Sequence, residues 1–293
     1  MDEHRYWTEA IGRIEGAPRM TIDRLAGLPD DTSVTPNPAR MYDYILGGNH
    51  NTESDRIAAE RARAIYPDMP LVFRANRAFL RRAVLYLIDQ GIDQFLDVGS
   101  GIPTVGNVHE IAQNANEAAH VVYVDVDPVA TALSAAVLRG NAQATVIQAD
   151  ARDPASILNH PETRRLLDLD RPVALLLVSM LLFVPDDAEA TGLVRTFRDA
   201  LAPGSYLALS HPVSEAGTPE VVARSEAVYA RTDRSARARP RAQVEGFFAG
   251  FEAVEPGIVW LPLWRPEDID DFGDLLLSEP QRSGMVGGVG RKA

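Results

Sequence analysis

The chain has 293 residues, 46% of them hydrophobic, which suits one large α/β domain or a domain with an attached cover. Its net charge of −12 disfavours a general nucleic-acid binder, and no apolar run reaches the roughly 18 residues of a transmembrane helix. Because cysteine is absent, disulfides, thiolate metal sites and cysteine catalysis are excluded.

The first 34 residues are polar and interrupted by glycine and proline, so we expect residues 1–34 to form a weakly ordered extension. No basic region precedes an apolar stretch, as it would in a secretory signal. The expected location is therefore the cytoplasm, and no membrane contact is expected.

Residues 39–48 predict a short helix closed by Gly47 and Gly48, followed by a polar loop over 49–56 that can cap a helix. A longer amphipathic helix is predicted over 70–90. The tyrosine-rich first helix suits either a mobile cover over a ligand or an N-terminal packing helix. We predict an N-terminal helical lid over residues 35–90.

After residue 91, apolar runs alternate with helical periodicity, which predicts an open, doubly wound, mostly parallel α/β sheet. Strands are predicted over 94–98, 121–125, 144–148, 173–178, 206–210, 253–261 and 285–290. Helices are predicted over 105–116, 128–138 and 188–201, and in a long stretch after 210 that runs through 248.

A glycine turn follows the strand over 94–98. Gly99 and Gly101 allow a tight turn and the close approach of a ligand to the backbone, and the helix after the turn offers free N–H groups. A dinucleotide fingerprint requires a third glycine, whose place is taken by Thr104. Alone, the pattern fits an ordinary turn as well as a nucleotide site.

Acidic and hydroxyl side chains stand at successive strand ends. Asp97 ends the first strand, Asp125 the second, at about the spacing of an acid that binds a ribose, and Asp150 follows the third. Ser179 follows the fourth strand. Each acid alone could be a helix cap, but three behind one glycine turn indicate a ligand site. So many acids would repel phosphates, which favours S-adenosyl-L-methionine over NAD.

These motifs resemble those of class I S-adenosylmethionine-dependent methyltransferases, and more narrowly a bacterial family known as "S-adenosyl methyltransferase", long a domain of unknown function. The matching blocks lie at 39–48, 74–80, 94–104, 107–110, 123–128, 255–257, 264–266 and 288–291. The resemblance implies a seven-stranded Rossmann-like sheet with an antiparallel last strand, a methyltransferase-like domain over 91–293, and the cofactor across the first two strand ends. The chain departs from the family where a histidine often follows the fourth strand, because Leu182 stands there.

We expect methyl transfer from S-adenosyl-L-methionine to a small-molecule acceptor. Gly99 and Gly101 would shape the methionine end of the site, Asp97 would support the ammonium group, and Asp125 and Asp150 would take the ribose and the adenine. Lid residues facing the acceptor would be Tyr42, Asp43 and Tyr44. His211, just past the fifth strand, is the best remaining candidate for a general base.

Two other functions remain open. A protein that binds the cofactor without transferring the methyl group, as a regulator or interaction partner, is suggested by Leu182 and the lack of an obvious base. An NAD-dependent oxidoreductase is disfavoured by Thr104. The six histidines lack metal-ligand spacing, so no metal is expected. The arginine cluster over 231–241 predicts a solvated helix end and loop, or an anion-binding patch.

Overall fold

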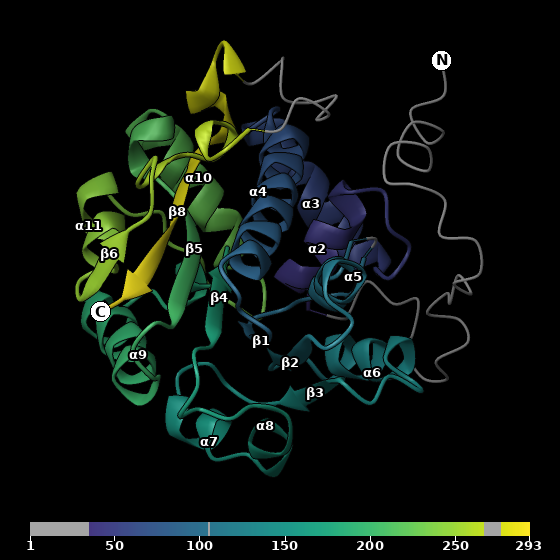
Figure 1. The fold of residues 1–293 in the computed structure, drawn as a ribbon. Helices are drawn as coiled ribbons and strands as arrows, with labels where there is room; N and C mark the ends of the chain where they lie inside the picture. The colour runs from purple at the N-terminus through teal and green to yellow at the C-terminus, as the bar shows by residue number, and fades with distance from the viewer. Residues whose placement is uncertain (1–34, 105, 267–276) are drawn as a thin grey trace.

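The computed structural model describes residues 35–104, 106–266 and 277–293 (Figure 1). The expected extension over 1–34 lies outside the described residues. The described strands form one sheet in the order β3-β2-β1-β4-β5-β8-β6, and β7 pairs with β8 off this path. Its strands are β1 (Gln94–Val98), β2 (His120–Asp125), β3 (Ala144–Gln148), β4 (Ala174–Val178), β5 (Tyr206–Pro212), β6 (Phe251–Ala253), β7 (Val259–Trp260) and β8 (Met285–Lys292).

Strands β1 to β5 are parallel to one another, whereas β8 is antiparallel to its neighbours β5, β6 and β7. This confirms the predicted doubly wound, mostly parallel sheet with an antiparallel last strand. The chain reverses its direction of growth across the sheet at β1, which lies between β2 and β4. Ligands of such sheets bind at the carboxyl ends of the strands beside this reversal, so the topology marks the edge where a site is expected.

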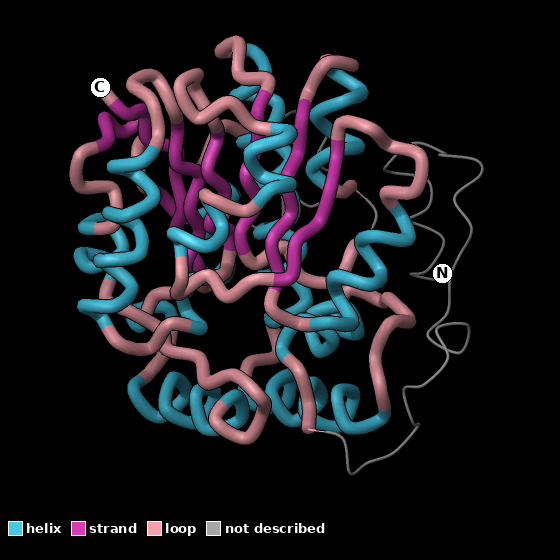
Figure 2. Tube along the Cα trace, turned by 90° about the horizontal axis from the view of Figure 1, so that it is seen from below, coloured by secondary structure: helices cyan, strands magenta, loops and turns pink. Residues whose placement is uncertain are grey.

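Helices cover both faces of the sheet (Figure 2). They are α2 (Pro38–Ile45), α3 (Glu53–Ile65), α4 (Met69–Asp89), α5 (Val108–Ala115), α6 (Pro128–Val137), α7 (Pro154–Leu158), α8 (Pro161–Leu166), α9 (Asp187–Ala200), α10 (Pro219–Tyr229) and α11 (Arg241–Gly246). Successive residues of the central strands face opposite clusters, as the pleat of a strand requires. Leu175 and Leu177 share a cluster with Phe197 of α9, and Leu176 shares another with Phe79 of α4. None of the described helices is long and apolar enough to cross a membrane.

The predicted strand over 253–261 is divided into β6 and β7, which gives eight strands where seven were expected. The cause is local, because Pro256 cannot donate a backbone hydrogen bond and Gly257 takes φ 88°, a turn conformation. The amide of Gly257 closes this turn on the carbonyl of Val254 at 2.7 Å. Both short strands still pair with β8.

The helical stretch predicted through residue 248 is also interrupted. It is divided into α10 and α11, and the segment over 230–240 that joins them is not helical. Within this segment Arg239 is fully buried, and Pro240 precedes α11. The solvated loop expected for the arginine cluster is therefore wrong for Arg239.

The N-terminal helices form a unit against the carboxyl edge of the sheet. Helix α2 begins at Pro38, where the side chain of Asn37 caps two backbone amides. Thr52 and Asp55 form a capping box that starts α3, so this helix begins within the loop predicted over 49–56. Helix α4 packs on the sheet through Phe79, whereas the lid role of residues 35–90 stays a prediction.

Candidate active site

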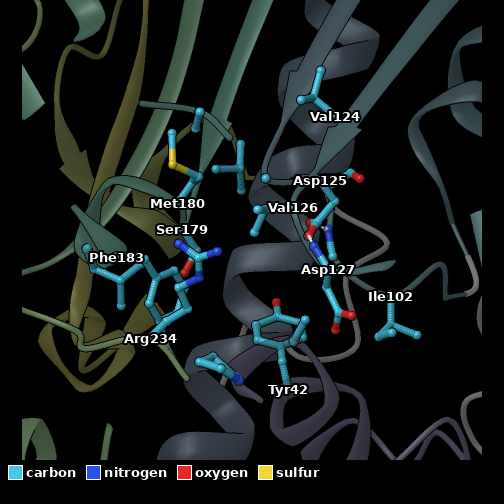
Figure 3. A pocket seen from close by; sticks show the side chains of 18 of the residues that line it. Tyr42, Ile102, Val124, Asp125, Val126, Asp127, Ser179, Met180, Phe183 and Arg234 are labelled. Atoms are coloured by element: carbon cyan, nitrogen blue, oxygen red, sulfur yellow. Dashed lines mark hydrogen bonds between the residues drawn. The ribbon is translucent and has the colours of Figure 1, made fainter. Parts of the chain in front are cut away.

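A cavity of about 350 Å³ lies at the carboxyl ends of β1 to β4, in the size range of small-molecule sites. Its wall also includes α2, α4 and the residues after α10. Figure 3 shows two sides of this cavity, with Ser179, Met180, Phe183 and Arg234 on one, and Ile102, Val124, Asp125, Val126 and Asp127 on the other.

The glycine turn is held tightly in place between strands. Gly99 takes φ 78° and Gly101 takes φ 68°, conformations that L side chains rarely adopt. A Cβ on Gly99 would lie 2.2 Å from Cγ of Met180, so this position has no room for a side chain. The amides of Gly99 and Ser100 donate to the carbonyl of Val124 at 2.8 and 3.1 Å, which ties the turn to β2.

Asp125 connects the end of β2 to the glycine turn. Its carboxylate accepts from the amide of Gly101 at 2.7 Å and from the amide of Asp127 at 2.9 Å. Burial raises its pKa, and these two backbone hydrogen bonds act in the opposite direction. The carboxylate lines the cavity and keeps further lone pairs for a ligand. Asp127 caps α6 through the amide of Val129, as expected of an acid beside Pro128.

Asp97 is a buried acid beside the cavity. Burial raises its pKa to about 7, with the negative charge of Asp125 adding to the rise and the guanidinium of Arg77 opposing it. Arg77 lies on α4 and donates to the carbonyl of Gly106 at 2.6 Å, beyond the glycine turn. The site therefore holds a carboxyl group whose charge depends on what binds near it.

Asp150 stands at the mouth of the cavity after β3. Arg152 donates to both of its carboxylate oxygens, at 2.5 to 3.1 Å, and Arg234 lies 3.8 Å away. These pairs hold the pKa of Asp150 below its usual range. An adenine amino group would have to share this carboxylate with Arg152.

Ser179 takes φ 53° directly after β4, an unusual conformation for a residue other than glycine. Its amide donates to the side chain of Ser210 at 3.0 Å. Ser210 in turn donates to Asn76 at 2.6 Å, and Asn76 donates to the hydroxyl of Tyr42 at 3.3 Å. A polar chain thus runs from the end of β4 to the N-terminal helices.

Of the three predicted lid residues, Tyr42 alone lines the cavity. Its ring stacks on Phe73 with centroids 4.2 Å apart, and its hydroxyl donates to the carbonyl of Phe73 at 3.0 Å. Asp43 is buried and accepts from the amide of His50, so it orders the loop after α2. Tyr44 donates to Glu60 on the outside of the helix pair. The predicted contacts of Asp43 and Tyr44 with the acceptor are not supported by these positions.

His211 does not reach the cavity, and the geometry contradicts its predicted role as the base. Its ring is fully buried on the opposite side of β5 from Ser210, against Phe247. Nδ1 donates to the carbonyl of Pro212 at 2.8 Å, so Nε2 accepts from Arg239 at 3.0 Å. Burial lowers the pKa of His211 to about 3, which keeps the ring neutral.

Several lining residues were not singled out from the sequence as site residues. They are Phe73, Asn76 and Arg77 on α4, Met180 and Phe183 after β4, Tyr229 at the end of α10, and Arg234 beyond it. The block at 74–80 entered the prediction only through the resemblance. Asn76, a polar residue among the buried apolar residues of this helix, was the signal that could have marked it as a site residue. Nothing local distinguishes Arg234 from its neighbouring arginines.

The family model for "S-adenosyl methyltransferase" matches residues 29–293. The chain belongs to this family. The match spans the sheet, the cavity and the N-terminal helices, and it confirms the resemblance inferred from the motifs. No curated protein matches the chain.

Two solved structures support this membership of the S-adenosyl methyltransferase family. A candidate methyltransferase from Thermobifida fusca YX is 41% identical with a TM-score of 0.81, over 88% of this chain and 95% of that chain. A DUF574 family protein from Streptomyces avermitilis MA-4680 is also 41% identical, with a TM-score of 0.84, over 90% of this chain and 100% of that chain. An O-methyltransferase family protein from Burkholderia thailandensis, 12% identical with a TM-score of 0.50, shares the fold over 99% of this chain and 70% of that chain.

Proposed function

We propose that the protein transfers a methyl group from S-adenosyl-L-methionine to a small-molecule acceptor. The observation that carries this proposal is the convergence of Asp97, Asp125 and Asp150 with the glycine turn on one cavity. Family membership gives the reaction class, and the cavity supports the cofactor.

The charges of the cavity fit a cationic cofactor. Its lining includes five aspartates, Asp97, Asp125, Asp127, Asp150 and Asp233, against three arginines, Arg77, Arg152 and Arg234. S-adenosyl-L-methionine carries a sulfonium and an ammonium group against one carboxylate, so an acid-rich site attracts it and disfavours a diphosphate. Among the described residues, the buried hydroxyl of Ser100 on the glycine turn has no hydrogen-bond partner, which leaves it available to a ligand.

Each part of the cofactor has a matching group. Asp97 holds the ammonium, and Arg77 on the facing helix is suited to the carboxylate of the methionine part. Asp125 accepts from the ribose hydroxyls while it keeps its bonds to the backbone. Ile102 beside the glycine turn and Asp150 at the mouth flank the adenine.

When bound, the cofactor supplies a methyl group to the acceptor nucleophile by in-line displacement, and the electron pair of the broken C–S bond stays on sulfur. The residues of this chain contribute by orientation, which can supply several kcal/mol, roughly 7–11 at most. Met180 and the glycine turn hold the floor of the site rigid, and Tyr42 with Phe73 closes it from the N-terminal side.

Titration calorimetry with S-adenosyl-L-methionine tests the cofactor. We expect binding to the wild type and at least about tenfold weaker binding to Asp125→Ala, because hydrogen bonds to a charged group are lost. Asp186→Ala is the matched control, since Asp186 caps α9 outside the cavity and should leave the affinity unchanged. Absence of binding at millimolar cofactor, or equal affinity in Asp125→Ala, would contradict the proposal.

Methyl transfer itself is tested by the formation of S-adenosylhomocysteine with a pool of small acceptors. Turnover would exclude a protein that binds the cofactor only as a regulator. Cofactor binding without product in any pool would favour that alternative, which no comparison supports.

A further inference from the structure

Four aromatic residues of the cavity wall form two pairs. Tyr42 and Phe73 are stacked with centroids 4.2 Å apart, on the side of α2 and α4. Phe183, after β4, meets Tyr229 edge to face at 6.2 Å. All four residues line the cavity, so two aromatic pairs from distant parts of the chain frame one space.

The two pairs are close to each other as well as to the cavity. Burial raises the pKa of Tyr229 to about 12, and the neighbouring Tyr42 adds to this rise. Val228, Tyr229, Tyr44 and Phe73 also pack against one buried cluster, which contains Met41 and Met69. The rings therefore enclose one region and are not scattered along the wall.

Arg234 places a positive charge beside these rings. Figure 3 shows Arg234 and Phe183 on the same side of the cavity, across from Asp125. Its ion pair with Asp150 is long, at 3.8 Å, while Arg152 already donates to both oxygens of that carboxylate. Asp233 also lies near its charge. A guanidinium has five N–H donors, so Arg234 can still donate to a further anion.

An apolar stretch of wall lies beside Phe183. Leu182, Phe183 and Val184 all line the cavity, and the carbonyls of Leu181 and Val184 are held by the buried guanidinium of Arg239. Arg239 is itself held by contacts with Asp187 and His211, so its two hydrogen bonds to the carbonyls keep this part of the wall in place. A fixed apolar wall suits a flat, rigid ring better than a flexible polar chain.

We propose that the methyl acceptor is a flat aromatic molecule with an anionic substituent, its ring between the two aromatic pairs and its anion on Arg234. This inference rests on the proposed function, because it assigns the acceptor of that same reaction. The acceptor loses a proton from its hydroxyl or amino group to water, and the oxygen or nitrogen forms the new bond to the methyl carbon. Aromatic rings also attract cations, but the guanidinium beside these rings opposes a cationic acceptor.

Four probes separate ring from charge in titrations against the protein saturated with S-adenosylhomocysteine. They are 4-hydroxybenzoate, cyclohexanecarboxylate, 4-hydroxybenzyl alcohol and tyramine. We expect 4-hydroxybenzoate to bind at least about tenfold more tightly than the other three, because it alone has both features. Equal affinity for cyclohexanecarboxylate would contradict the requirement for an aromatic ring. Tighter binding of tyramine would contradict the requirement for an anionic substituent.

Two variants locate the contacts. Arg234→Gln should weaken the binding of 4-hydroxybenzoate at least about tenfold. Phe183→Leu, which keeps an apolar side chain, should weaken it about two- to tenfold. Arg231→Gln is the control, since Arg231 belongs to the same arginine cluster but does not line this cavity. Unchanged affinity in both Arg234→Gln and Phe183→Leu would overturn the proposed contacts.

The cofactor provides the check on the underlying reaction. S-adenosylhomocysteine should bind the wild type and Phe183→Leu within about twofold, because Phe183 contacts none of the acids assigned to the cofactor. Binding of S-adenosylhomocysteine without binding of any aromatic acid would overturn the acceptor class and leave the proposed function standing. No binding of S-adenosylhomocysteine to the wild type would instead overturn the proposed function itself.

Discussion

At the scale of single residues, the site combines a costly charge with a turn that tolerates no side chain. Asp97 is buried near Asp125, and Arg77 offsets this cost only in part, so its pKa lies at about 7. A positively charged ligand beside Asp97 would favour the ionised form. The buried carboxyl group lowers the stability of the ligand-free protein and can bind a cation in its ionised form.

Asp97→Asn should stabilise the ligand-free protein at high pH and weaken its cofactor binding. Between pH 3.8 and about 7 the folded wild type keeps a proton that the unfolded chain has released, so its stability falls as pH rises. Asp97→Asn lacks this pH-dependent loss of stability, because asparagine does not ionise. Its gain in the free energy of unfolding should therefore be larger at pH 8 than at pH 5, by on the order of a few kcal/mol.

Urea unfolding of wild type and Asp97→Asn at the two pH values measures this difference. A gain that is equal at both pH values would contradict the raised pKa. Calorimetry on the same samples should show weaker binding of S-adenosylhomocysteine by the variant at pH 8.

Gly99→Ala should destabilise the protein more than an alanine at another glycine of similar conformation. The added Cβ would lie 2.2 Å from Cγ of Met180, and the backbone is at φ 78°. Gly140→Ala is the control, because Gly140 has φ 85° and no atom of the described residues lies within 4 Å of an added Cβ. The control should lose about 1–2 kcal/mol from backbone strain alone.

Chemical unfolding of both variants checks this expectation. The excess loss in Gly99→Ala should shrink when Met180→Ala is added, because the clash is then removed. Equal losses of unfolding free energy in Gly99→Ala and Gly140→Ala would contradict this prediction, because the Met180 side chain would then move away without destabilising the protein.

At the scale of elements, Arg40 joins the N-terminal helices to the cofactor half of the site. Its guanidinium lies 2.8 Å from Asp55 at the start of α3 and 3.3 Å from Asp127 at the start of α6. The backbone amide of Asp127 donates to the carboxylate of Asp125, which also accepts from the amide of Gly101. A buried chain of polar contacts thus connects α2 and α3 with the glycine turn.

Arg40→Met should destabilise the protein by about 3–5 kcal/mol, because it leaves the buried Asp55 without its cation. It should also weaken cofactor binding, since Asp127 and Asp125 lose their support. Arg63→Met is the control, because the exposed Arg63–Glu60 pair contributes less than about 1 kcal/mol.

Unfolding free energies and calorimetry with S-adenosylhomocysteine test both parts of this prediction. Hydrogen exchange of residues 53–65 should accelerate in Arg40→Met and stay unchanged in Arg63→Met. Wild-type cofactor affinity in folded Arg40→Met would show that the helices and the cofactor site are not coupled.

At the scale of the whole molecule, strands were predictable because their signal is local, and the position of the three acids at the strand ends followed from strand order. β1 and β3 have the predicted bounds, and Asp97, Asp125 and Asp150 do meet at one edge. Contacts across the fold were not predictable, since nothing near Arg234 in the sequence places it beside Asp150. The division of the strand over 253–261 could have been predicted from Pro256 and Gly257.

The error at His211 also had a local cause. Neighbouring residues on a strand point to opposite faces, so Ser210 and His211 cannot both face the cavity. Ser210 bonds Asn76, which lines it, and His211 faces Arg239. The predicted strand ends at 210, whereas β5 continues to Pro212, so the alternation of faces applies to His211 as well.

A crystal structure of the protein grown with S-adenosylhomocysteine tests the central claim most directly. The account predicts density in the cavity, with the ribose hydroxyls within hydrogen-bond distance of Asp125 and the methionine part beside the Gly99–Gly101 turn. An empty cavity at saturating ligand, or the ligand bound away from Asp125 and the glycine turn, would contradict it.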